Sequence, residues 1–211
     1  KEMIFYRLDN AAGTMQYDRM PNRSGNTTNY RGGSLLGATQ EMVDAYFMSN
    51  GESPISGYSA DGVTPIINEK SDYVEEGVST AEYKGIDGTL YAPVGTRMMY
   101  VNREPRFYAD LGFDRGYWFG NGRTKDVGKG TASETPWIVA AKKGQMSGKT
   151  KETTYSRSGY FCKKMVHFEA ATDANGKATY ARTTYPLMRL ADLYLLYAEA
   201  LNESLNEPND E

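Results

Sequence analysis

The 211-residue sequence has one cysteine and one histidine. Because there is a single cysteine, Cys162, no internal disulfide is possible and a cysteine-rich zinc site is excluded. His167 is the sole candidate base for a histidine triad, and a multi-histidine metal site is excluded too. Both residues lie in the alternating segment 160–168, which favours a strand with structural roles for them. We therefore expect no metal and no cofactor.

The sequence also lacks an excess of basic charge and a long apolar run. With 24 Lys and Arg against 27 Asp and Glu, its net charge is −3, which argues against a nucleic-acid partner. Its longest apolar runs, 193–198 and 137–141, fall far short of the ~18 residues of a membrane span. The sequence opens with Lys1 to Tyr6 and then turns polar, so the apolar stretch of a signal peptide is not expected here. Mean hydropathy of −0.63 with 12% aromatic residues indicates a folded, loop-rich chain.

The clearest predicted element is a helix near the C-terminus. Pro186 suits the first helical position, and Leu187 to Leu201 contains neither glycine nor further proline. Leucine, tyrosine and alanine occupy most of its circumference, so the helix should be buried on most sides. The rest of the sequence offers only one other convincing helix to cover it. We therefore expect the covering helices to lie outside this sequence, in a longer protein.

The other predicted elements are short. A helix is expected from Gln40 to about Met48, with Thr39 as N-cap and Asn50-Gly51 as its end. Residues 3–8 are predicted as a strand and 9–38 as a long polar loop. Asp87-Gly88 and Asn175-Gly176 each predict a β-hairpin. The fold class expected is mainly α, with irregular loops and short β-hairpins.

Two motifs suggest ligand chemistry but have a plainer interpretation. Gly144 to Thr150 ends Gly-Lys-Thr, yet only three residues separate its glycines and no amphipathic helix follows, so we do not expect a phosphate-binding loop. Arg103 and Arg106 could clamp an anion, although a structural role in an irregular region is favoured.

Four segments, in order, resemble the SusD/RagB family. They are Ala38 to Tyr46 with Asn50-Gly51, Tyr100 to Tyr108 (with Glu104 where the family has Asp), Ser158 to Lys164, and Tyr185 to Glu203. The resemblance implies the C-terminal part of one SusD-like, tetratricopeptide-repeat-based domain, loop-rich over 1–183 and with a long buried helix over 184–205. It also implies a missing N-terminal helical part. That part would carry the lipid-bearing cysteine, which Cys162 is not.

The resemblance implies binding rather than catalysis. Family members are Bacteroidetes surface lipoproteins of the outer membrane that bind oligosaccharides, or peptides in RagB-type relatives. They deliver these nutrients to a SusC-like TonB-dependent transporter. We expect glycan capture for this chain, with peptide binding as the alternative and a carboxylate-pair glycoside hydrolase as a third hypothesis.

Candidate ligand-binding residues follow from exposed aromatic rings, on which sugar rings stack. Tyr17, Tyr30 and Arg31 lie in a polar, glycine-rich segment, and Trp118 lies between glycines at 116, 120 and 122. The family's layout places such loops beside the ligand. Trp118 has a second interpretation, as a core residue.

Overall fold

The computed structural model describes residues 2–8, 12–22, 32–118, 137–145, 147–149, 154–167, 171–172, 178–179 and 184–204. The chain divides into two compact units. Unit 1 combines Lys1–Ala12 with Arg182–Glu211, and unit 2 is Gly13–Ala181.

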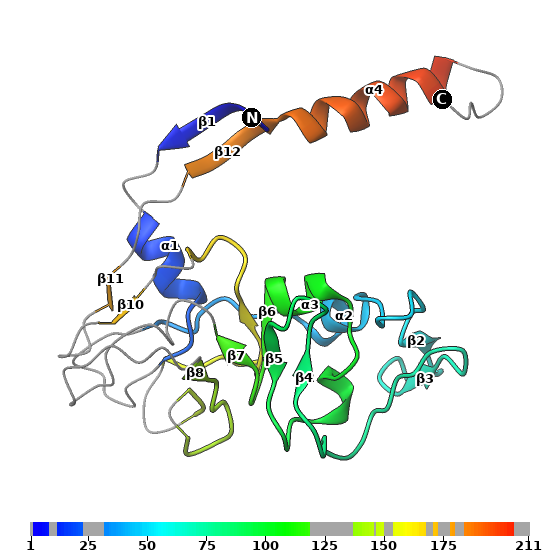
Figure 1. The fold of residues 1–211 in the computed structure, drawn as a ribbon, viewed down its shortest axis with the longest axis vertical. Coiled ribbons are helices and arrows are strands. Elements are labelled where there is room, and N and C mark those ends of the chain that lie inside the picture. The colour runs from blue at the N-terminus through cyan, green and yellow to red at the C-terminus, as the bar shows by residue number, and fades with distance from the viewer. Residues whose placement is uncertain are drawn as a thin grey trace. The chain divides into compact units, whose positions relative to one another are not determined.

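Unit 1 is a two-stranded ribbon that continues into a helix (Figure 1). Strand β1 (Met3–Leu8) pairs antiparallel with β12 (Thr184–Arg189), and α4 (Leu190–Ser204) follows directly. The start of α4 is capped by Asp192, whose Oδ2 accepts the backbone N–H of Arg189 at 3.0 Å. A carboxylate in the first turn also suits the positive end of the helix.

The predicted start of this helix, with Pro186 as its first residue, is wrong. Pro186 lies in β12 opposite Tyr6, and the helix begins at Leu190 and ends at Ser204. The ladder with β1 keeps residues 184–189 extended, and a strand with a free edge tolerates a proline that cannot donate. No residue of α4 is buried within its own unit. Its burial by helices outside this chain therefore remains a prediction.

Unit 2 is built from short helices and two-stranded antiparallel ribbons (Figure 1). Its helices are α1 (Ala12–Arg19, whose first residue falls in unit 1), α2 (Gln40–Asp44), the 3-10 helix η1 (Met98–Tyr100) and α3 (Pro105–Asp110). Its ribbons pair β2 (Ile55–Tyr58) with β3 (Pro65–Ile67), β4 (Tyr83–Lys84) with β5 (Leu90–Ala92), β6 (Leu111–Gly112) with β9 (Phe161–Cys162), β7 (Tyr117–Trp118) with β8 (Trp137–Ile138), and β10 (Ala171–Thr172) with β11 (Ala178–Thr179).

The described residues form a mixed structure rather than the mainly α fold expected from the sequence. Turn chemistry explains the ribbons. At the predicted Asp87-Gly88 hairpin, the N–H of Gly88 donates to Gly85 at 2.9 Å, and Gly88 has a φ of 80° that favours glycine. The second hairpin, predicted between arms at 160–168 and 178–184, is confirmed in part. Strand β10 pairs with β11, whereas β9 in the predicted first arm pairs with β6, and the turn lies outside the described residues.

The predicted loop over residues 9–38 contains a helix, α1, which the sequence did not indicate. Tertiary contacts hold it: the buried Gln16 accepts the backbone N–H of His167 at 2.9 Å, and Gly33 donates to the carbonyl of Tyr17 at 2.6 Å. His167 lies beyond β9 rather than in a strand, whereas Cys162 is in β9 as predicted.

The core of unit 2 has two clusters of buried side chains. The larger surrounds Phe107 and consists of Val43, Met48, Ile55, Tyr73, Ala92, Met99, Tyr100, Phe107, Tyr108, Leu111, Phe113 and Tyr160. The smaller consists of Met20, Trp118, Val139, Phe161 and Val166. Among the described residues, no helix has the length and apolar character needed to cross a bilayer.

Candidate functional site

A buried arginine fixes α2 against the segment before α3. The side chain of Arg103 is fully buried, and its Nη2 donates to the carbonyls of Val43 at 2.5 Å and Tyr46 at 2.8 Å. Its guanidinium carbon lies 4.8 Å from the centre of the Phe107 ring. Val43 lies in the last turn of α2 and Tyr46 just beyond it, where backbone carbonyls lack the partner four residues on that a helix interior supplies. Arg103 therefore terminates α2 at Asp44, earlier than the predicted Met48.

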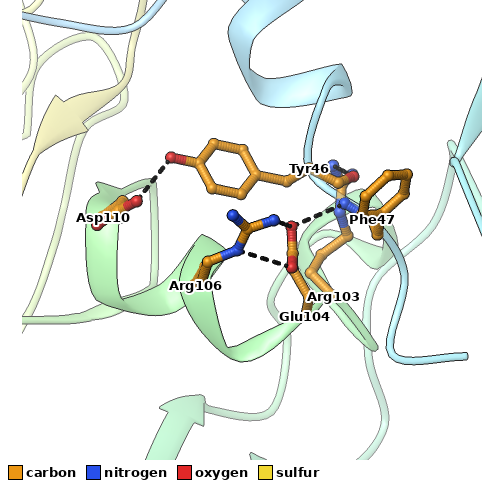
Figure 2. Close-up of polar contacts among 6 residues, drawn as sticks. All are labelled: Tyr46, Phe47, Arg103, Glu104, Arg106 and Asp110. Atoms are coloured by element: carbon orange, nitrogen blue, oxygen red, sulfur yellow. Dashed lines mark hydrogen bonds and ion pairs between the residues drawn. The ribbon is translucent and has the colours of Figure 1, made fainter. Parts of the chain in front are cut away.

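The adjacent residues complete this junction (Figure 2). Glu104 accepts the backbone N–H of Phe47 at 3.1 Å and pairs with the Nε of Arg106 at 3.1 Å. The hydroxyl of Tyr46 donates to Asp110 at 3.0 Å. Burial, and then this hydrogen bond, raise the pKa of Tyr46 to about 12. The two arginines thus have the structural role favoured from the sequence and do not form an anion clamp.

Lys163 is the second buried cation. Its Nζ donates to the backbone carbonyls of Tyr108 and Tyr117, each at 2.8 Å, and lies 5.7 Å from the centre of the Trp118 ring. Burial lowers the pKa of Lys163 to about 7, since the interior disfavours the charged form. This side chain joins the end of α3 to β7, so it too organises the fold.

Of the four residues nominated as ligand-binding, two can be placed. Trp118 is 0% exposed and meets Phe161 edge-on, with ring centres 6.4 Å apart. It is therefore a core residue, and its nomination as an exposed stacking surface is corrected. Tyr17 is half-buried, with its ring against Gly33. Tyr30 and Arg31 lie outside the described residues, so a binding role for them and for Tyr17 stays a prediction.

Tyrosines that the sequence did not single out form a partly exposed aromatic group. Tyr91 stacks on Tyr108 with ring centres 4.2 Å apart and an interplanar angle of 3°, and Tyr83 packs against both rings. Tyr83 and Tyr91, on β4 and β5, are half-buried. Tyr117 on β7 is half-buried as well. These residues are widely spaced along the chain and share no sequence signal. Packing of the β4–β5 ribbon against α3 and β7 brings them to one part of unit 2.

A small pocket lies between the turn after α3 and the loop after β8. Its volume is about 100 Å³, and its lining consists of Asp114, Arg115, Ile138, Val139, Ala140, Lys142 and Gln145. Among the described residues, no group of three His, Cys, Asp or Glu side chains is placed to hold a metal ion.

The chain belongs to the SusD family, whose model matches residues 1–210. Proteins of this family bind ligands without catalysing a reaction. No curated protein matches the chain.

Solved structures share the fold. The chain is similar to a SusD-like protein (BF3747) from Bacteroides fragilis NCTC 9343, with 23% identity, a TM-score of 0.59, and coverage of 97% of this chain and 33% of that one. It is also similar to BT4246, with 22% identity, a TM-score of 0.56, and coverage of 96% of this chain and 30% of that one. For the selenomethionine form of BT4246, the identity is 22% and the TM-score is 0.57, and the match covers 98% of this chain and 31% of that one. The chain thus spans about a third of the length of these structures.

Proposed function

We propose that this chain is part of a cell-surface protein that captures oligosaccharides and delivers them to a SusC-like TonB-dependent transporter. The observation that carries the proposal is the match of the SusD family model to residues 1–210. Half-buried tyrosines such as Tyr91 and Tyr117 support it, because an aromatic ring gives sugar C–H groups an apolar surface while the hydroxyl remains near water.

The location and the remaining scaffold are parts of the same proposal. The protein would be held at the outer membrane by a lipid on an N-terminal cysteine outside this sequence. In this proposal α4 packs against helices of the same longer protein, since Leu195 and Tyr197, 71% and 64% exposed here, are costly to leave in water.

Calorimetric titration of the full-length protein against a panel of neutral and acidic oligosaccharides tests the proposal. Binding of at least one glycan, without release of new reducing ends, is expected. Binding of peptides alone would favour the RagB-type alternative, and release of reducing ends by purified protein would contradict passive capture.

A further inference from the structure

Charge is unevenly distributed within unit 2, although the whole chain has a net charge of only −3. Residues 40–87 contain ten acidic and two basic side chains, whereas residues 137–167 contain seven basic and one acidic. Of these seven, Lys163 is buried and Lys151 lies outside the described residues, which leaves five that the structure places at or near the surface. When charges of one sign gather on part of a surface, they raise the local concentration of ligands that carry the opposite charge. The basic segment contains the loop that lines the small pocket described above.

The pocket is too small for a sugar ring but large enough for an acidic substituent. Ligand pockets for whole small molecules measure roughly 300–1,000 Å³, and one water takes about 30 Å³ of liquid volume. At about 100 Å³, the pocket fits a carboxylate or a sulfate. Two of its lining residues, Arg115 and Lys142, are cationic, against one carboxylate, Asp114.

Part of the Arg115 guanidinium is used within the fold. Its Nη2 donates to the carbonyl of Val94 at 2.7 Å, and its Nε is buried beside Gly95 without a hydrogen-bond partner, so the terminal Nη donors are the ones that would meet a ligand. A guanidinium carries five N–H donors in a planar fork that suits carboxylate and sulfate oxygens. Its backbone is in the left-handed region with φ of 68°, which is strained for a residue other than glycine.

Asp114 does not cancel the positive character of the pocket. Its Oδ1 accepts the backbone N–H of Ala141 at 2.8 Å, and its Oδ2 lies 4.0 Å from the Nζ of Lys142. Since Lys142 is largely exposed, this pair is weak and its ammonium remains free to turn toward a ligand. The summed charge of the lining is still positive.

The loop that holds Lys142 and Gln145 is closely built. The N–H of Ser147 donates to Ala140 at 2.8 Å, and Gln145 accepts the N–H of Lys142 at 3.3 Å. A Cβ on Gly148 would lie 1.9 Å from the carbonyl oxygen of Lys142, so only glycine allows this approach. The loop therefore presents its side chains from a defined backbone.

An aromatic ring lies beside the pocket. Tyr117 pairs with Ile138 across the β7–β8 ribbon, and paired residues have their side chains on the same face. Ile138 lines the pocket. Burial, and then the charge of Glu82, raise the pKa of Tyr117, and the charges of Lys84 and Arg115 oppose that rise. A half-buried ring and a cationic pocket are thus neighbours.

We propose that this surface is a subsite for an acidic sugar, which stacks on Tyr117 and places its carboxylate or sulfate between Arg115 and Lys142. The inference rests on the proposed glycan capture and specifies its substrate class. Affinity for such a ligand falls as salt rises, because the attraction between exposed charges is screened.

The test uses the full-length protein and paired ligands that have the same sugar backbone and differ chiefly in charge. Tetragalacturonate is compared with its methyl ester, and short dextran sulfate with dextran of the same length. We expect one acidic member to bind at least tenfold more tightly than its neutral partner. Lys142→Gln and Arg115→Gln should each weaken that binding on the order of tenfold, as loss of a hydrogen bond to a charged group does.

Lys143→Gln is the matched control, because Lys143 is exposed, adjacent, and outside the pocket lining. It should leave affinity within about twofold, and equal loss in Lys143→Gln and Lys142→Gln would overturn the subsite. A thermal melt identifies any misfolding in Arg115→Gln, in which case Lys142→Gln decides. Equal binding of acidic and neutral partners would overturn this inference and leave glycan capture standing. Failure of every oligosaccharide to bind would overturn both.

Discussion

The Nη2 atom of Arg103 lies 2.5 Å from the carbonyl oxygen of Val43, sixty residues earlier in the chain. The same nitrogen reaches Tyr46, and Nη1 reaches the carbonyl of Met99 at 3.3 Å. One fully buried side chain thus donates to backbone carbonyls in two segments, of which that of Val43 also accepts the N–H of Tyr46 at 3.4 Å. Much of the Asn-Arg-Glu-Pro-Arg-Phe motif is accounted for by this junction.

Replacing Arg103 should therefore be among the most damaging changes in unit 2. Arg103→Met keeps much of the apolar stem but removes the side-chain donor from the carbonyls of Tyr46 and Met99 and the stronger of two donors from that of Val43, so we expect a loss of about 3 kcal/mol in the free energy of unfolding. Urea denaturation measures it. Arg106→Met is the control, since Arg106 is 71% exposed and loss of its pair with Glu104 should shift the midpoint far less than Arg103→Met does. Equal effects of the two variants would contradict the assignment.

Local signals in the sequence located several elements correctly. Thr39 caps α2 as predicted, accepting the N–H of Met42 at 3.3 Å, and the strand over residues 3–8 is confirmed. These features depend on neighbours within a few residues. The start of α4 could not be found this way, because the pairing that keeps Pro186 extended comes from β1, at the other end of the chain.

The candidate site was harder to predict for the same reason. From composition alone, Trp118 could be either exposed or buried. It is buried because Phe161, from a strand distant in the sequence, packs against it. The pocket combines residues around 114 and 142, which no motif connects. Exposure of α4 within this chain does not test its predicted burial, since the expected partner helices are not in the sequence.

The tyrosines predict a loss of stability in alkali. Burial raises the pKa of Tyr46, and a hydrogen bond to Asp44 raises that of Tyr58, each to about 12 in the folded protein against 10 when unfolded. Between pH 10 and 12 the folded state holds more protons, so its stability should fall as pH rises through this window. Ultraviolet titration of phenolate should show a late-ionising component that Tyr46→Phe and Tyr58→Phe each reduce. Normal ionisation of all tyrosines near pH 10 in folded protein would disprove this.

Gly112 should not tolerate a side chain. A Cβ there would lie 2.5 Å from Cζ3 of Trp118 and 3.2 Å from the Cβ of Phe161, in the fully buried part of the smaller cluster. Because overpacking costs about 1–3 kcal/mol, Gly112→Ala should lower the thermal midpoint by several degrees. Gly51→Ala is a control for backbone strain alone, as its φ is 85° and open space surrounds it. A larger loss at Gly51 than at Gly112 would argue against this packing.

Lys163 predicts a stability change of the opposite sign at lower pH. Burial lowers its pKa to about 7 from 10.5, so between these values the unfolded state binds more protons and folding stability rises with pH. The slope is up to about 1.4 kcal/mol per pH unit for one proton. In Lys163→Met this contribution is absent, although the variant also loses hydrogen bonds to Tyr108 and Tyr117. Denaturation between pH 7 and 9 should therefore show a steeper rise in the parent than in the variant, and parallel curves would mean that Lys163 keeps its normal pKa.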